Sequence, residues 1–387
     1  MVIFFDVGEE MKYLVSIILV LFCVPIFSAP VLLDNHPFDR AITNDSLQSI
    51  AVLFSSPDGI SEVFFELNSE IIPLSDERVM LDDSSFVFTP DVPFFHREDV
   101  SYRFFLRDTI GIGFSDTLTA NFVVNLRSPF ARNPYPPGSS WVSDTGVVVS
   151  VEVIDGLMLD KPPPPPRPLI DSMSLRLCVN DSVFSPDSPL ASWDGLHFSV
   201  RLPETFLYPG ETLFVSLTDA RDNPDYGEPH TLEETLSWQL FVGKPFAVHI
   251  RRGWGIYSCP GVVSSCFIDT SFIFRIGFDT GRRLFFYADS FPSGFGFWGL
   301  SLEGKTDTLF FVPDDTVTFH LLPGWNLVGA PGFELDIEDI FSLSPSLVPP
   351  AYEYISGVGY IELAGPLQPF GGFWLFSLDT VSLEVSE

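Results

Sequence analysis

Apolar and polar residues alternate one by one through many short segments of this chain, and this pattern most constrains its fold. Every second residue of 147–153 (VVVSVEV) is valine, and residues 100–107 (VSYRFFLR) and 196–202 (LHFSVRL) alternate in the same way. A period of two puts one set of side chains on each face of a β-strand, so that one face is buried and the other wetted. Such strands form antiparallel sheets that pack in pairs, which predicts β-sandwiches.

Composition supports strands and restricts the partners. The chain of 387 residues holds 40 phenylalanines but only 5 methionines, and aromatic residues favour strands. Its 51 acidic and 20 basic residues give a formal net charge of −31 at pH 7. Binding to nucleic-acid phosphates needs the opposite sign of charge, so no nucleic acid is expected as a partner.

The N-terminal segment predicts export. Met11, the expected true start, and Lys12 precede an apolar run at residues 14–22, and small residues follow the run. A basic start, a short apolar core and small residues at the end are typical of a secretory signal peptide, here residues 1–29. Pro30 disfavours cleavage, so an anchor that stays in the membrane is the alternative.

Beyond the signal peptide, no apolar run is long enough to span a bilayer, and no further transmembrane segment is expected. The chain is therefore expected outside the cytoplasm, secreted or on the cell surface, with the periplasm as the alternative. A protein or a glycan of the cell envelope is the expected partner.

Residues 30–127 and 128–243 look like two divergent copies of one module. Each copy runs through a polar turn, an apolar strand, an Asp-Gly turn, a strand that ends in asparagine and a strand that runs into aspartate. About 100 residues with short strands is the size of an immunoglobulin-like sandwich. The order resembles the bacterial immunoglobulin-like modules of extracellular proteins, which implies a fold but no function. Linkers are expected at the Pro-rich residues 127–138 and near residues 243–245.

Residues 244–387 contain a sharper repeat, with copies at about 251–319 and 320–387. The motif GWGIYSCPG at residues 253–261 recurs as GWNLVGAPG at residues 324–332, and each copy also has one Gly-Phe-Trp strand. Equivalent positions are what a shared core requires, so the tryptophans at these positions are expected in the core. They are Trp254, Trp298, Trp325 and Trp374.

The second copy supports two further expectations. It resembles the "GWNL…Y…GY…L.P..G.W" repeat of many bacterial surface and secreted proteins, through Tyr354, Tyr360 and residues 367–369 as well as the opening motif. This resemblance implies a location outside the cytoplasm but no single activity. Residues 336–341 (DIEDIF) have acidic residues first and apolar ones at helical spacing, which predicts a short helix. The chain is thus predicted to be all-β: two immunoglobulin-like β-sandwiches followed by a tandem-repeat, mostly antiparallel β domain.

Three cysteines follow the signal peptide. Cys259 and Cys266 would close a small loop, and in an oxidising compartment they are the expected disulfide. Two unpaired thiols held too far apart are the alternative. Cys178 is then left over and is interpreted as structural.

No catalytic motif is recognisable, so the chain is not expected to be an enzyme. None of the six histidines forms a His-x-x-x-His pair or stands beside a plausible nucleophile, and there is no Gly-x-Ser-x-Gly elbow or P-loop. A hydrolase site assembled from distant residues stays open as the third interpretation.

Residue type suggests two candidate binding sites. Four oxygen-bearing side chains crowd one loop and are a calcium candidate, with an ordinary solvated turn as the alternative; they are Asp219, Asp222, Asn223 and Asp225. Three tyrosines are candidates for an exposed ligand-binding strip: Tyr352, Tyr354 and Tyr360. Apart from calcium, no cofactor is expected.

These observations lead to one function and two alternatives. We expect a non-catalytic exported protein, secreted or on the surface, that acts in adhesion, spacing or display. Carbohydrate binding by the C-terminal β domain is the alternative, because sugars bind flat, exposed aromatic rings. A hydrolase with an unrecognised site is the third.

Overall fold

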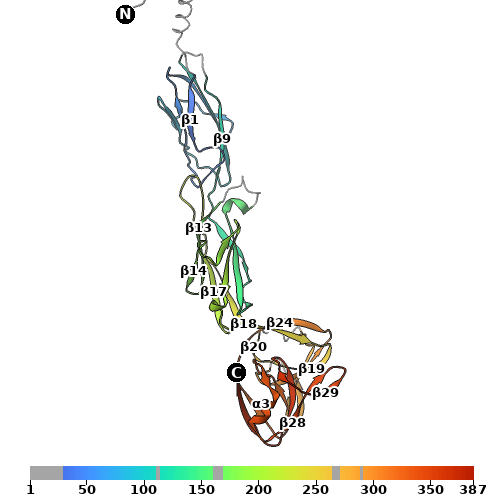
Figure 1. The fold of residues 1–387 in the computed structure, drawn as a ribbon. Coiled ribbons are helices and arrows are strands. Elements are labelled where there is room, and N and C mark those ends of the chain that lie inside the picture. The colour runs from blue at the N-terminus through green and yellow to red at the C-terminus, as the bar shows by residue number, and fades with distance from the viewer. Residues whose placement is uncertain (1–28, 110–113, 160–168, 264–270, 288–290) are drawn as a thin grey trace, which may run out of the picture. The chain divides into compact units, whose positions relative to one another are not determined.

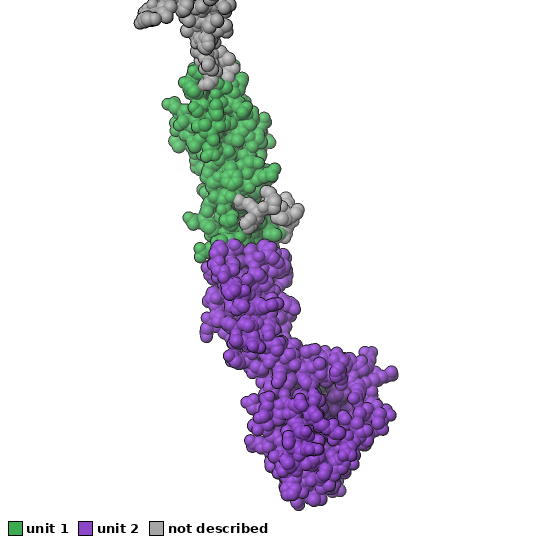
Figure 2. Space-filling view, viewed as in Figure 1, with its two compact units in different colours: residues 1–130, 154–171, 221–233 green, residues 131–153, 172–220, 234–387 purple. Residues whose placement is uncertain are grey.

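A computed structural model describes residues 29–109, 114–159, 169–263, 271–287 and 291–387 (Figure 1). The predicted signal peptide and Cys266 lie outside these residues. The chain forms two compact units, residues 1–130, 154–171 and 221–233 in the first and residues 131–153, 172–220 and 234–387 in the second (Figure 2). The described residues are mostly strands, so the predicted all-β class is confirmed. Within these ranges, no helix has the length and apolar character needed to cross a membrane.

The first sandwich has the strand order of an immunoglobulin-like fold. One sheet has the order β1-β3-β7-β6 and the other β2-β9-β8-β4-β5, and β2 runs parallel to β9. The strands of the first sheet are β1 (Val31–His36), β3 (Ile50–Ser55), β6 (Val79–Leu81) and β7 (Ser85–Phe88). Those of the second are β2 (Ala41–Thr43), β4 (Ile60–Leu67), β5 (Glu70–Ile71), β8 (Asp99–Asp108) and β9 (Leu118–Val124).

Phenylalanines fill the core of this sandwich, where many immunoglobulin domains have a disulfide and a tryptophan. The ring of Phe65 on β4 lies 4.8 Å from that of Phe86 and 5.4 Å from that of Phe88, both on β7 of the facing sheet. On β8, the alternation predicted for residues 100–107 is confirmed, because Val100, Tyr102, Phe104 and Leu106 are all buried. Ring contacts between the sheets thus replace a covalent link.

The second sandwich repeats the same strand order. Its sheets are β10-β12-β16-β15 and β14-β13-β17-β18, with β11 parallel to β18. The valines at positions 149, 151 and 153 are buried as their spacing predicts. The strands are β10 (Phe130–Tyr135), β11 (Ser140–Ser143), β12 (Gly146–Ile154), β13 (Ile170–Val179), β14 (Ser182–Phe184), β15 (Ala191–Trp193), β16 (His197–Pro203), β17 (Thr212–Asp222) and β18 (Leu236–Ile250).

The predicted linker near residues 243–245 is wrong, because these residues lie inside the 15-residue strand β18. In the other predicted linker, residues 127–138, strand β10 takes up half of the residues, and the boundary between the two compact units falls at residues 130–131. The first half of β18 pairs with β17 and its second half with β24 (Lys305–Pro313). Gly243 suggested a break, but a Cβ at this position would lie 2.9 Å from the ring of Trp141 and 3.1 Å from Phe310. Close packing, and not flexibility, requires this glycine.

The third module confirms the internal repeat. Its sheets β19-β23-β21-β22 and β26-β31-β28-β29 have the same order, and the outer pairs β18–β24 and β25–β32 also correspond. The first copy contains β19 (Gly253–Ser258), β20 (Gly261–Val263), β21 (Phe274–Asp279), β22 (Leu284–Tyr287) and β23 (Gly296–Ser301). The second contains β25 (Thr316–Leu321), β26 (Gly324–Gly329), β27 (Leu335–Asp336), β28 (Leu347–Ile355), β29 (Gly359–Glu362), β30 (Pro366–Leu367), β31 (Gly372–Ser377) and β32 (Val381–Ser386).

The predicted helix is present as α3 (Ile337–Leu343). Asp336 is its N-cap, and its side chain accepts a hydrogen bond of 3.0 Å from the backbone N–H of Glu338. This bond satisfies one of the free N–H groups of the first turn. The apolar side of the helix packs into the core of the second copy through Ile337 and Ile340.

Candidate ligand-binding site

The two copies of the repeat are joined by a matched pair of backbone hydrogen bonds. The N–H of Ser258 donates to the carbonyl of Phe370, and the N–H of Gly329 donates to the carbonyl of Gly294, each at 3.0 Å. Residues 258 and 329 are equivalent in the repeat, and so are residues 294 and 370. Each copy therefore gives the other the contact that it receives, as in a small dimer with two-fold symmetry.

Aromatic rings cross between the copies in the same reciprocal way. The ring of Trp298 lies 4.7 Å from that of Tyr354, and the ring of Trp374 lies 5.0 Å from that of Phe278. Both contacts are edge-on, the geometry that the charge distribution of aromatic rings favours. Together with the buried side chains of Ile256 and Leu327, these rings form one apolar cluster shared by the two copies.

The prediction that all four repeat tryptophans lie in the core is wrong for Trp325. Trp374 is 8% exposed, whereas Trp325 is 43% exposed and Trp254 and Trp298 are partly buried. Trp325 lies on the same face of β26 as the buried Leu327, two residues nearer the start of the strand. Leu327 belongs to the apolar cluster that includes Phe278 and Trp298 of the first copy. Trp325 lies at the edge of this cluster, where one side of its ring stays open.

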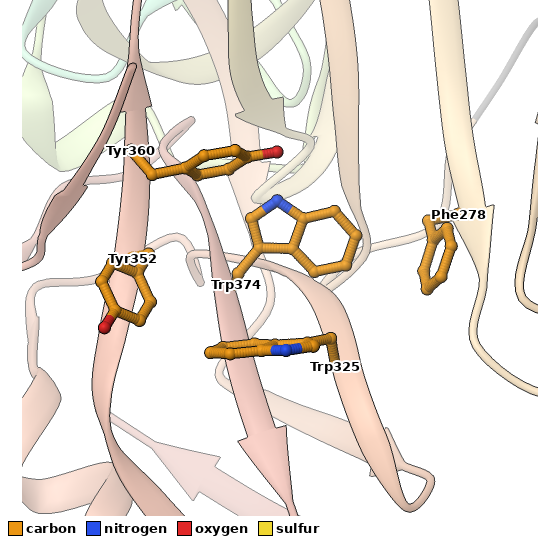
Figure 3. Close-up of a pocket in the computed structure, with 5 residues that line it drawn as sticks. All are labelled: Phe278, Trp325, Tyr352, Tyr360 and Trp374. Atoms are coloured by element: carbon orange, nitrogen blue, oxygen red, sulfur yellow. The ribbon is translucent and has the colours of Figure 1, made fainter. Parts of the chain in front are cut away.

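The open side of Trp325 faces a cavity of about 450 Å³ (Figure 3). Two of the predicted tyrosines, Tyr352 on β28 and Tyr360 on β29, line this cavity, and the third, Tyr354, packs against Tyr360 at 5.4 Å. The rings of Trp325 and Tyr352 meet at 64° with their centroids 5.7 Å apart. The described residues that line it are all aromatic: Phe278, Trp325, Tyr352, Tyr360 and Trp374.

Few polar groups are available in this cavity. The indole N–H of Trp374 is buried, has no acceptor among the described residues within hydrogen-bond distance, and points toward the Tyr360 hydroxyl (Figure 3). Burial raises the pKa of Tyr360, and the nearby indole N–H offsets part of this rise. The phenol is therefore neutral at physiological pH, and the lining carries no charge.

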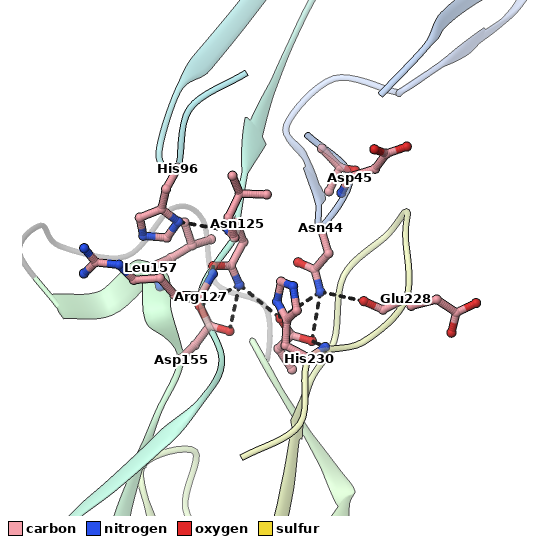
Figure 4. Close-up of polar contacts among 12 residues, drawn as sticks. Asn44, Asp45, His96, Asn125, Arg127, Asp155, Leu157, Glu228 and His230 are labelled. Carbon is pink, nitrogen blue, oxygen red and sulfur yellow. Dashed lines mark hydrogen bonds and ion pairs between the residues drawn. The ribbon is translucent and has the colours of Figure 1, made fainter. Parts of the chain in front are cut away.

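Two of the four residues predicted to bind calcium accept hydrogen bonds from the protein. The buried carboxylate of Asp222 accepts from the side chains of Asn44, Asn125 and His230. Figure 4 labels these three donors. A carboxylate oxygen of Asp225 accepts from the backbone N–H of Ile42 at 2.8 Å. Asn223 is exposed, and Asp219 lies earlier on β17. Across the described ranges, no group of three or more histidine, cysteine or acidic side chains is placed to hold a metal ion.

A histidine–hydroxyl pair occurs at equivalent places in the two copies, and the sequence interpretation missed it. Nδ1 of His320 lies 3.1 Å from the Ser382 hydroxyl, and Nδ1 of His249 lies 2.8 Å from the Thr306 hydroxyl. The statement that no histidine stands beside a nucleophile is thus wrong for His320. Each pair is exposed and directly opposite on neighbouring strands. Such a repeated pair is typical of cross-strand contacts, whereas a catalytic histidine is oriented by a buried carboxylate.

The cysteines give a partial result. Cys259 is buried, and burial raises the pKa of its thiol to about 11. Its expected partner, Cys266, lies outside the described residues, so the disulfide stays a prediction. Cys178 is partly buried, with its sulfur 3.6 Å from the hydroxyl of Thr218.

No model of a protein family matches the chain, and no curated protein matches it. Among solved structures, the titin I-band fragment I67–I69 is 8% identical with a TM-score of 0.34, over 78% of this chain and 94% of its own length. The titin tandem A164–A165 is 10% identical with a TM-score of 0.24, over 56% and 100%. The Ig1–2 module of the Drosophila receptor phosphatase DLAR is 12% identical with a TM-score of 0.21, over 56% and 99%. The immunoglobulin-like description of this chain rests on its own strand order.

Proposed function

We propose that this chain is a non-catalytic modular protein, secreted or on the cell surface, that acts in adhesion, spacing or display. Two immunoglobulin-like sandwiches in one chain support this role, because such modules present binding surfaces on a rigid β scaffold. The sequence of residues 1–29 supports export. The net charge of −31 suits a well-solvated surface.

The single observation that carries a binding role is the open ring of Trp325 in the aromatic cavity of the C-terminal domain. Cavities of 300–1,000 Å³ lined by apolar and aromatic side chains are the usual form of small-ligand sites. Binding of a small ligand or of a carbohydrate by this domain is the second candidate function. It is compatible with the first, because an adhesive protein needs a module that recognises its target.

The test uses the full chain and its native cells. Cell fractionation with mass spectrometry of the mature N-terminus should find the protein in the surface or medium fraction. Labelled full-length protein should bind to intact cell envelopes, and Trp325→Ala should reduce this binding while Tyr287→Ala, which removes an exposed ring outside the cavity, should not. A chain confined to the cytoplasm, or binding that is equal for both variants, contradicts the proposal.

The hydrolase alternative has a direct test at the exposed contact between Ser382 and His320. Wild-type protein and Ser382→Ala should give the same background rate on esterase, glycosidase and peptidase substrates. A rate that the substitution abolishes would establish an enzyme and remove the non-catalytic proposal.

A further inference from the structure

The aromatic cavity has an unusual lining that restricts its ligand. All five lining side chains are rings, three of them tyrosine or phenylalanine and two tryptophan. Aromatic rings also fill the core of the first sandwich, where they are buried, whereas the ring of Trp325 in this cavity is 43% exposed and open to a ligand. What distinguishes rings from aliphatic side chains is the negative electrostatic potential of their faces.

A sugar is poorly matched to this lining. Each hydroxyl of a buried sugar needs a hydrogen-bond partner, because a buried polar group without one loses its hydrogen bonds to water and gains none in return. The cavity offers the hydroxyls of Tyr352 and Tyr360, and the indole N–H of Trp374 is buried without an acceptor among the described residues. No carboxylate, amide or guanidinium side chain belongs to the described lining.

The charge around the cavity favours a cation. Four of the five lining residues come from the segment 306–387, which contains no lysine or arginine and 12 aspartates and glutamates. The fifth, Phe278, lies in the first copy. A one-sign charge distribution raises the local concentration of oppositely charged ligands. The segment that supplies four of the five described lining residues therefore carries a net negative charge.

We propose that this cavity is an aromatic cage for a quaternary ammonium group. The corner formed by the rings of Trp325 and Tyr352 receives the methylated nitrogen, and the rings of Tyr360, Trp374 and Phe278 enclose it further (Figure 3). A methylated ammonium needs no hydrogen-bond acceptor, and its positive charge is attracted to ring faces. This inference rests on the proposed binding role of the C-terminal domain and names its ligand class.

The first experiment compares two ligands that differ only in charge. Full-length protein is titrated by calorimetry with choline and with 3,3-dimethyl-1-butanol, the neutral isostere in which carbon replaces nitrogen. A cation–π contribution should make choline bind about 2- to 30-fold more tightly than the isostere. Choline binding should also weaken as sodium chloride is raised, because salt screens the negative field of the protein.

Matched variants then locate the binding. Trp325→Ala should weaken choline binding at least about tenfold, and Trp325→Phe, which keeps a ring, should restore part of it. Because Trp325 is 43% exposed, these variants should fold. Tyr287→Ala removes a ring that is 61% exposed in the same domain and should leave the affinity unchanged.

Each other outcome overturns the proposal. Equal or tighter binding of the neutral isostere would make the cavity a simple apolar site. Saccharide binding that depends on Trp325, without choline binding, would replace the ammonium by a sugar and leave the proposed function intact. If none of the tested ligands binds, the proposed cage is wrong. The binding of full-length protein to cell envelopes is a separate measurement that tests the proposed function itself.

Discussion

Nδ1 of His230 lies 3.1 Å from a carboxylate oxygen of Asp222, whose side chain is 2% exposed. The backbone N–H of His230 donates to the other oxygen at 2.7 Å. The side-chain amides of Asn44 and Asn125 complete the set of donors around this carboxylate. Asp222 is therefore the centre of a buried polar network in the first compact unit.

Removal of this carboxylate should be costly. Asp222→Ala would remove the acceptor of the His230 imidazole. The amides of Asn44 and Asn125 would keep only the carbonyl of Glu228 and the more distant carboxylate of Asp155. We expect a loss of about 3–5 kcal/mol in the free energy of unfolding, measured by urea denaturation. The exposed Asp99 on β8 provides a control, because Asp99→Ala should change the stability by less than about 0.5 kcal/mol. A small effect of Asp222→Ala would show that water replaces the network.

A pH dependence should follow from the neighbouring Asp155. Burial, assisted by the negative charge of Asp222, raises its pKa from the ordinary value of 3.8 to about 6. The folded state thus holds a proton that the unfolded state releases. The stability from this group is fully present below about pH 4 and is lost as the pH rises through about 6. The loss is on the order of 2–3 kcal/mol.

Asp155→Asn should remove this part of the pH dependence, because asparagine keeps an acceptor for the N–H of Leu157 but does not ionise. The measurement is the urea midpoint of wild type and variant at pH 4.5 and at pH 7.5. The two proteins should differ more at pH 7.5, with the variant more stable there. If the urea midpoints of wild type and variant differ by the same amount at pH 4.5 and at pH 7.5, Asp155 does not titrate in this range.

The two tryptophans of the second copy should differ in their effect on stability. Trp374→Ala removes a side chain that is 8% exposed and should cost about 3–5 kcal/mol. Trp325→Ala removes one that is 43% exposed and should cost about 1 kcal/mol. Chemical unfolding followed by circular dichroism measures both. Equal losses would show that Trp325 is packed more tightly than its exposure indicates.

Glycines at the seam between the copies should not tolerate a side chain. A Cβ at Gly296 would lie 2.6 Å from the carbonyl oxygen of Val328, which is backbone and cannot move freely. Gly296→Ala should therefore destabilise the protein by at least about 2 kcal/mol in thermal or urea unfolding. At Gly304 the nearest atom to a Cβ is 3.6 Å away, so Gly304→Ala serves as the tolerated control.

Local patterns predicted local structure well. Alternation identified the buried faces of β8 and β12, and the acidic start of residues 336–341 identified α3 with its Asp336 cap. These features depend on neighbours within one element, so the sequence contains all the information. The repeat was also visible, because two copies with the same strand order preserve the same glycine and tryptophan positions.

Long-range contacts could not be predicted in the same way. The cavity joins Phe278 to rings up to 96 positions later in the chain (374 − 278 = 96), and nothing in the spacing says which rings meet. Equivalent positions suggested equivalent burial, but Trp325 lies at the edge of the apolar cluster that the two copies share. The loop acids suggested calcium, because the sequence does not show the amide donors of Asn44 and Asn125.

The strand β18 has a consequence for any attempt to divide the protein. Its 15 residues are hydrogen-bonded to β17 at one end and to β24 at the other. A cut at the Gly243–Pro245 stretch would divide this continuous strand and remove the pairing of Lys244 and Pro245 with Phe311 and Phe310 of β24. The second sandwich and the tandem repeat should therefore resist proteolytic separation and unfold in one cooperative step. A pulling force on the repeat domain would then pass directly into the second sandwich through the backbone of β18.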